Sequence, residues 1–105
     1  MKPAPFLYER PQTVEEAVSL LAEHGDDAKV LAGGQSLMPL LNMRLARPRV
    51  LVDINGVSQL DNMSRLDGAL RCGALVRQAA SASEGASPLL DRCRAYIGHL
   101  SLIHI

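Results

Sequence analysis

The segment Ala32-Gly33-Gly34-Gln35-Ser36 decides how the rest of this chain is interpreted, because it lies between a predicted strand and a predicted helix. The preceding run Lys29-Val30-Leu31 is short and apolar, and it predicts a buried strand. After the segment, Ser36 is expected to cap a helix that continues to about Met43. Pro39 is compatible with that helix because it falls in the first turn, where its missing N–H costs little.

This small-residue segment has the chemistry of a phosphate-binding loop. A phosphate needs several converging N–H donors, and side chains beyond Cα obstruct that approach. Gly33 and Gly34 remove the obstruction and allow positive φ, and the helix that follows offers unpaired N–H groups. Gln35 and Ser36 add neutral side-chain donors. By itself the pattern fits a pyrophosphate site or a plain connection between two elements.

Two common nucleotide-binding motifs are missing from the same segment. No Lys follows the glycines, so the segment is not a Walker A loop. The third glycine of the GxGxxG pattern is also missing, so it is not the dinucleotide-binding turn of a Rossmann unit. A nucleotide held in either of these ways is therefore disfavoured.

A helix is predicted upstream of the segment. Thr13-Val14-Glu15-Glu16 is a capping box, in which the Thr hydroxyl and the Glu carboxylate each satisfy a free backbone N–H. Gly25 is expected to end this helix. Its apolar stripe is predicted to consist of Val14, Ala17, Val18 and Leu21.

The flanking sequence predicts a mixture of further strands and helices. Val50–Ile54 is β-branched and apolar, and it predicts a second buried strand, followed by a turn at Asn55-Gly56. Two strands joined through a helix of this length suit a parallel βαβ-like unit. The other predicted elements are a short strand around Phe6 and Tyr8, a hairpin between 62–66 and 69–74 that turns at Asp67-Gly68, and helices over 77–84 and 87–96.

Length and composition exclude several classes of function. With 105 residues the chain is one domain at most, and its formal net charge of +0 excludes a broad basic surface for nucleic acid. It has one Phe, two Tyr and no Trp, so a stacking platform for single-stranded nucleic acid is also excluded. No run approaches the roughly 20 apolar residues of a membrane span, and the start lacks a signal-peptide pattern. We therefore expect a cytoplasmic protein.

The chain shows no arrangement typical of a catalytic or metal site. Cys72 and Cys93 form no CxxC pair and have no His at ligand spacing, so they are predicted to be reduced thiols. No Ser–His–Asp or Cys–His pattern is supported by spacing. Arg44 and Arg47 could share a helix face and contact an anion, or simply be solvated. Asp53 could orient a ligand hydroxyl or bond the next turn. The sequence thus predicts binding rather than bond-making.

The stretch from Val30 to Pro48, VLAGGQSLMPLLNMRLARP, closely resembles the first FAD-binding motif of the flavoprotein (medium) subunit of molybdenum hydroxylases. This family includes the medium subunit of carbon monoxide dehydrogenase and the FAD subunit of bacterial xanthine dehydrogenases. The similarity extends from about Lys2 to His99 and includes the strand Leu51–Ile54.

The resemblance implies an α+β fold, the N-terminal subdomain of a vanillyl-alcohol-oxidase-like (PCMH-type) FAD-binding domain, here truncated. It implies that the FAD pyrophosphate is bound by Leu31, Ala32, Gly33, Gly34, Gln35, Ser36 and Leu37. Implied partners are a molybdopterin-binding large subunit and a small subunit with 2Fe–2S clusters, which supplies electrons that FAD passes to NAD+, oxygen or another acceptor. Molybdopterin and cluster ligands are expected on those subunits only.

The end of the chain departs from the family pattern. Family members continue into a second glycine-rich FAD motif, which Leu100–Ile105 does not resemble. We therefore expect residues 1–99 to be the N-terminal part of the FAD-binding domain and 100–105 to be a non-native tail. The alternative is a small non-catalytic α/β interaction domain in which Gly33-Gly34 is only a turn.

Overall fold

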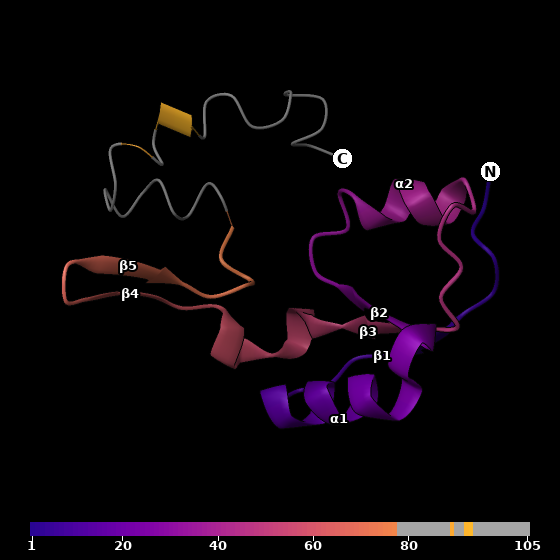
Figure 1. Ribbon diagram of the computed structural model, residues 1–105, viewed down its shortest axis with the longest axis horizontal. Coiled ribbons are helices and arrows are strands. Elements are labelled where there is room, and N and C mark those ends of the chain that lie inside the picture. The colour runs from indigo at the N-terminus through magenta and orange to yellow at the C-terminus, as the bar shows by residue number, and fades with distance from the viewer. Residues whose placement is uncertain (78–88, 90–91, 94–105) are drawn as a thin grey trace. The chain divides into compact units, whose positions relative to one another are not determined.

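A computed structural model describes residues 1–77, 89 and 92–93 of the chain (Figure 1). The chain divides into two compact units, Met1–Leu60 and Asp61–Ile105, which are described separately below. The helices predicted over 77–84 and 87–96 lie almost entirely outside the described residues, and the tail predicted at 100–105 lies wholly outside them. Within the described part, no helix is long and apolar enough to cross a membrane.

The first unit is built on a three-stranded parallel sheet with the order β1-β3-β2. Its strands are β1 (Leu7–Glu9), β2 (Ala28–Leu31) and β3 (Val50–Asp53). The central strand, β3, is the last in sequence. A helix, α2 (Leu37–Asn42), joins β2 to the neighbouring parallel strand β3 and confirms the predicted βαβ unit. The predicted strand around Phe6 and Tyr8 is also confirmed, as β1.

The two helices of this unit lie on opposite faces of the sheet (Figure 1). The connection from β1 through α1 (Val14–His24) passes over β3 to reach β2, and the next connection returns in the other direction. Parallel connections are almost always right-handed, so a reversal of direction places successive helices on opposite faces. The sheet is therefore covered from both sides, and short 3-10 turns, Gly25–Asp27, Ile54–Gly56 and Ser58–Leu60, complete the unit.

Helix α1 begins and ends as its sequence predicts. Thr13 Oγ1 accepts a hydrogen bond from the Glu16 N–H at 3.1 Å, and Glu16 Oε2 accepts one from the Gln12 N–H at 3.1 Å. Both acceptors of the capping box are thus used, although the carboxylate reaches the residue before the cap rather than the cap itself. Gly25 ends the helix with φ +55°, and its N–H donates to the Leu21 carbonyl.

The core of the first unit surrounds β3, whose residues are all buried. Leu51 and Val52 are almost wholly inaccessible to solvent, and Leu41 of α2 and Ala17 of α1 are also buried. Since β3 has a strand on each side and a helix over each face, it loses nearly all its solvent contact. The prediction of a buried strand at Val50–Ile54 is confirmed.

Two predictions of burial are wrong. Val30 in β2 is 43% exposed, because among the described strands β2 lies at the edge of the sheet and pairs with β3 alone. Val18 in α1 is 58% exposed, so it does not belong to the buried stripe. The buried side of α1 is centred on Ala17, since only a narrow sheet lies beneath the helix.

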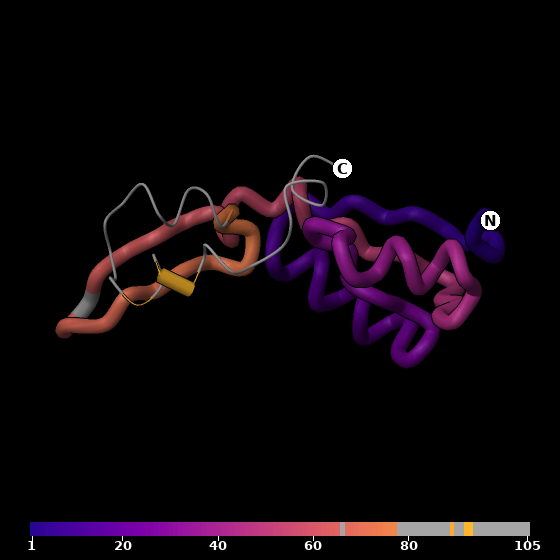
Figure 2. The backbone as a smooth tube through the Cα atoms, turned by 90° about the horizontal axis from the view of Figure 1, so that it is seen from above, coloured from indigo at the N-terminus to yellow at the C-terminus, as the bar shows by residue number. Residues whose placement is uncertain are grey.

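The second unit contains an antiparallel hairpin of β4 (Met63–Leu66) and β5 (Ala69–Cys72), whose strands run side by side in Figure 2. Asp67 and Gly68 join the strands, with φ of +51° and +78°. Positive φ at both turn positions matches a type I′ turn, which suits the twist of a two-residue hairpin. The predicted hairpin is confirmed, and β5 ends before Ala74.

Candidate functional site

The carboxyl ends of β1, β3 and β2 meet at one edge of the sheet, because the three strands are parallel. Arg10 follows β1 at this edge, Asn55 lies in the turn after β3, and the segment 32–36 follows β2. Ligands of open α/β sheets bind outside the carboxyl ends of the strands. The predicted site therefore lies at the edge where a ligand is expected.

We call residues 31–37 the glycine loop. Leu31 ends β2, Leu37 begins α2, and both are half-buried, as are Ala32 and Gly34. Gly33, Gln35 and Ser36 are exposed. The structure thus places all seven predicted residues in one continuous turn between a strand and a helix.

Gly34 is the residue of the glycine loop that needs to be glycine on backbone grounds. Its φ is +80°, which side chains rarely tolerate. A Cβ at this position would also lie 3.1 Å from Met38 Cγ and 3.4 Å from Leu31 Cδ1. Gly33 does not adopt positive φ, so the prediction that the two glycines share this role holds for Gly34 alone.

The backbone N–H groups of residues 33–37 donate no hydrogen bond to any other described residue. The first helical bond of α2 runs from the Met38 N–H to the Gly34 carbonyl at 2.9 Å, so the carbonyl side of the loop is used while these N–H groups are not. Backbone donors are normally paired with protein or solvent. A row of available donors beside small residues fits an anionic group such as a pyrophosphate.

Ser36 does not cap α2 as predicted. It occupies the cap position with φ −92° and ψ −40°, and its side chain makes no capping hydrogen bond. Capping residues normally have extended backbone, which directs the side-chain oxygen toward the N–H groups of the first turn. The helical conformation of Ser36 prevents this, so its exposed hydroxyl is not consumed by the helix.

Asn55 links the glycine loop to the end of β3. Its Nδ2 donates to the Ala32 carbonyl oxygen at 2.7 Å and to Asp53 Oδ1 at 2.6 Å. The Asn55 backbone N–H also donates to Asp53 Oδ1, at 2.9 Å. The predicted turn at Asn55-Gly56 is confirmed, but the sequence did not predict this link. The available signal was an Asn two residues after a strand-ending Asp.

Asp53 is a buried carboxylate whose oxygens are both occupied. Oδ2 accepts a hydrogen bond from the Tyr8 hydroxyl, and Arg10 Nε lies 3.9 Å from it. Burial acts to raise the pKa of Asp53, but the hydrogen bonds from Tyr8 and Asn55 and the charge of Arg10 outweigh it, so the pKa is lowered. The hydrogen bond to Asp53 is the main cause of a raised pKa for Tyr8. Of the two roles considered for Asp53, bonding the next turn is the one observed.

Arg44 and Arg47 do not share a helix face, because α2 ends at Asn42. Arg44 follows the helix with φ +56°, and its Nε donates to the Lys2 carbonyl at 3.3 Å. Arg47 Nε donates to the Arg44 carbonyl at 3.3 Å. These guanidinium groups hold the chain between α2 and β3.

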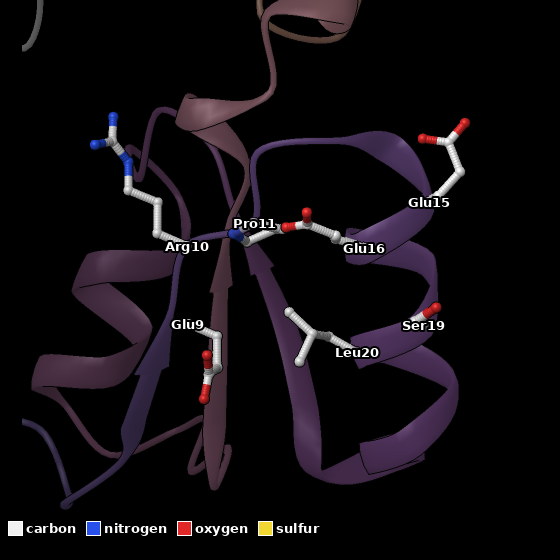
Figure 3. A pocket seen from close by; sticks show the side chains of 7 residues that line it. All are labelled: Glu9, Arg10, Pro11, Glu15, Glu16, Ser19 and Leu20. Carbon is white, nitrogen blue, oxygen red and sulfur yellow. The ribbon is translucent and has the colours of Figure 1, made fainter.

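An open groove of about 480 Å³ lies between the end of β1 and helix α1 (Figure 3). Its lining consists of Glu9, Arg10, Pro11, Glu15, Glu16, Ser19 and Leu20. Three carboxylates against one guanidinium disfavour an anionic ligand in this groove. No residue of the glycine loop lines it, so it is separate from the candidate site.

Comparison with known proteins agrees with the resemblance seen in the sequence. The profile of the family described as "FAD binding domain in molybdopterin dehydrogenase" matches residues 4–101, almost the whole chain. The cofactor that the resemblance implies, FAD, is the one that this description names.

Two curated relatives illustrate the similarity. The alpha subunit of the 6-hydroxypseudooxynicotine dehydrogenase complex of Paenarthrobacter nicotinovorans is 48% identical over 103 residues, which cover 94% of this chain and 35% of that protein. Caffeine dehydrogenase subunit beta of Pseudomonas sp. (strain CBB1) is 41% identical over 106 residues, which cover 97% of this chain and 36% of that protein. The chain therefore spans about a third of the length of these relatives.

The fold is also found among solved structures. A chain of Cu,Mo-CO dehydrogenase in its cyanide-inactivated form matches with a TM-score of 0.90 and 33% sequence identity, over 97% of this chain and 37% of that one. The expected fold, part of the FAD-binding domain of such enzymes, is thereby confirmed. The chain belongs to the family of FAD-binding domains of molybdopterin dehydrogenases.

Proposed function

We propose that the glycine loop binds the pyrophosphate of FAD through its backbone N–H groups. The loop consists of Leu31, Ala32, Gly33, Gly34, Gln35, Ser36 and Leu37, and the proposed donors are the N–H groups of residues 33–37. The observation that carries the proposal is the set of N–H groups over 33–37 that donate to no described residue, at the carboxyl edge of a parallel sheet.

Individual side chains of the loop have different roles in this proposal. Gly34 allows the backbone to turn with positive φ, at a position where a Cβ would press against Met38 and Leu31. Gly33 is exposed, and its lack of a side chain leaves room for a phosphate to approach the backbone. The Ser36 hydroxyl, which does not cap the helix, is available as a further donor to phosphate. Gln35 is exposed and can donate from its side-chain amide. Binding therefore rests on neutral donors, with no cation in the loop itself.

For the whole protein, we propose the FAD-binding, electron-transfer subunit of a molybdenum hydroxylase. The chemistry that FAD supplies when bound is the transfer of electrons from 2Fe–2S clusters on a small subunit to an acceptor such as NAD+ or oxygen. Substrate oxidation belongs to a molybdopterin-binding large subunit in this proposal. The subunit titles of the relatives, one from a dehydrogenase complex, support such an assembly.

Titration of the 105-residue chain with FAD, followed by amide NMR, tests the binding proposal. We expect chemical-shift changes to concentrate at residues 33–37, because their N–H groups would gain phosphate acceptors. Changes that avoid these residues, or no change at millimolar FAD, would overturn the proposal.

A substitution at Gly34 separates a binding loop from a plain turn. Gly34→Val should abolish the FAD-induced shifts and lower the unfolding midpoint of the chain, while the hairpin resonances of β4 and β5 stay unchanged. If the variant loses its fold and the parent chain shows no shift with FAD, Gly33-Gly34 is a turn, and the alternative of a non-catalytic interaction domain is favoured.

A further inference from the structure

We propose that Asn55 is a positioning residue that sets the direction of the first N–H donor of the glycine loop; this rests on the proposed function of that loop. We call the two hydrogen bonds from Asn55 Nδ2, to the Ala32 carbonyl oxygen at 2.7 Å and to Asp53 Oδ1 at 2.6 Å, the Asn55 bridge. Asn55 would not touch the ligand. It would act through the backbone of Ala32.

The orientation of the Asn55 amide is determined by its neighbours. The Ala32 carbonyl oxygen and an ionised Asp53 carboxylate are acceptors only, so both must face the NH2 group of Asn55. An amide NH2 has two hydrogens, one for each acceptor. The Asn55 bridge therefore has a unique assignment and uses the full donor capacity of the side chain.

The bridge fixes the direction of the Gly33 N–H through the peptide plane. The Ala32 carbonyl and the Gly33 N–H belong to one peptide group, and no peptide bond among the described residues is cis. In a planar trans peptide these two groups point in opposite directions. Because the Ala32 oxygen is held toward Asn55, the Gly33 N–H is turned away from the end of β3 and is left for a ligand.

The base of the bridge is held firmly. Asp53 ends the buried central strand, and its Oδ1 also accepts the Asn55 backbone N–H at 2.9 Å. Gly56, which follows Asn55, is packed so tightly that a Cβ there would lie 3.0 Å from the Pro11 carbonyl oxygen. Val57 is completely buried. A donor mounted on such a rigid turn can orient a more exposed loop.

Two variants and one matched control test this inference in the 105-residue chain. Asn55→Ala removes both hydrogens of the bridge, and Asn55→Asp replaces them with a group that repels Asp53 and the Ala32 oxygen. Gln59→Glu makes the same amide-to-carboxylate change where the side chain is an acceptor, for the Val14 N–H at 2.9 Å. The readouts are the Gly33 and Gly34 amide resonances without ligand, the FAD dissociation constant, and the unfolding midpoint.

We expect both Asn55 variants to shift the ligand-free Gly33 amide resonance and to raise the FAD dissociation constant about tenfold, the effect of one well-placed hydrogen bond. Gln59→Glu should change neither. Unchanged Gly33 resonances, or an FAD affinity equal to that of the control, would overturn the inference. If the parent chain shows no FAD-induced shifts but the Asn55 variants still move Gly33, the proposed function fails while the bridge itself stands.

A measurement on the unsubstituted chain covers the case in which neither variant folds. The two side-chain NH2 hydrogens of Asn55 should exchange with solvent much more slowly than those of Asn42, because each Asn55 hydrogen is bonded to an acceptor. Equal exchange rates for the two side chains would show that the Asn55 bridge does not form.

Discussion

The Tyr8 hydroxyl donates a hydrogen bond to Oδ2 of Asp53 and thereby ties β1 to the end of β3. Oδ1 of the same carboxylate is occupied by Asn55, so both oxygens of Asp53 act as acceptors. Protonation would turn one of these oxygens into a donor that faces other donors. The hydrogen bonds at the carboxyl edge of the sheet therefore depend on pH, because they require Asp53 to be ionised.

The stability of the chain should fall in acid because of Asp53. Its folded pKa is below the ordinary value of 3.8, so its contribution is fully present above that value and is lost as the pH falls through the folded pKa. Urea unfolding at several pH values should show this loss for the parent chain. Asp53→Asn should be less stable than the parent near neutral pH, but its free energy of unfolding should fall less steeply in acid. Asp61→Asn serves as the control and should keep the slope of the parent. An equally steep fall in Asp53→Asn would show that Asp53 does not cause the loss of stability in acid.

The pKa of the Tyr8 phenol should be higher than that of an ordinary tyrosine. The chain has two tyrosines, so a Tyr96→Phe background leaves Tyr8 as the only phenol. Its absorbance midpoint should lie above 10.0, mainly because its O–H is bonded to Asp53. The associated stability is present below 10.0 and is lost as the pH rises through the folded pKa. Adding Asp53→Asn should bring the midpoint down, and an unmoved midpoint would show that the pair does not form.

Gly34→Ala should destabilise the chain for two separable reasons. Positive φ costs a side chain roughly 1–2 kcal/mol, and the new Cβ would lie 3.1 Å from Met38 Cγ. Met38 is partly exposed, so Met38→Ala alone should cost little. In a double-mutant cycle of urea unfolding free energies, Gly34→Ala should cost less in the Met38→Ala background. Equal costs in both backgrounds would mean that the loop moves to relieve the contact.

Leucine truncation should distinguish the central strand from the edge. Leu51 in β3 is 1% exposed, and Leu51→Ala should lower the free energy of unfolding by about 2–5 kcal/mol. Leu7 in β1 is 64% exposed, and Leu7→Ala should cost far less. Urea unfolding gives the free energy of unfolding of each variant, so the same leucine-to-alanine change is compared in two strands that pair with each other. Similar losses would contradict the central position of β3.

Elements with local signals could be predicted from the sequence. The capping box at Thr13 and the stop at Gly25 define α1 without reference to the rest of the fold, because their hydrogen bonds join residues a few positions apart. The hairpin turn at Asp67-Gly68 is equally local. The pairing of β1 with β3 left no such trace, since Tyr8 and Asp53 are 45 residues apart.

The sequence indicates the segment that forms the candidate site, but not the hydrogen bonds that hold that segment in place. Gly33-Gly34 indicated a turn open to a ligand, whereas the Asn55 bridge depends on β2 and β3 being neighbours, which no short pattern reveals. The exposure of Val30 has the same origin, because sequence periodicity does not tell an edge strand from a central one. Ser36 failed as a cap because its backbone conformation, not its residue type, decided the outcome.

The order β1-β3-β2 also dictates when this sheet can assemble. A ribosome delivers β1 and β2 first, and within the described part of the chain each of them pairs only with β3. Both early strands must wait for Val50–Asp53 to emerge, and all ladder hydrogen bonds of this sheet then form across long loops, which slows folding. A nascent chain that stops before Val50 has no strand on which to build the sheet.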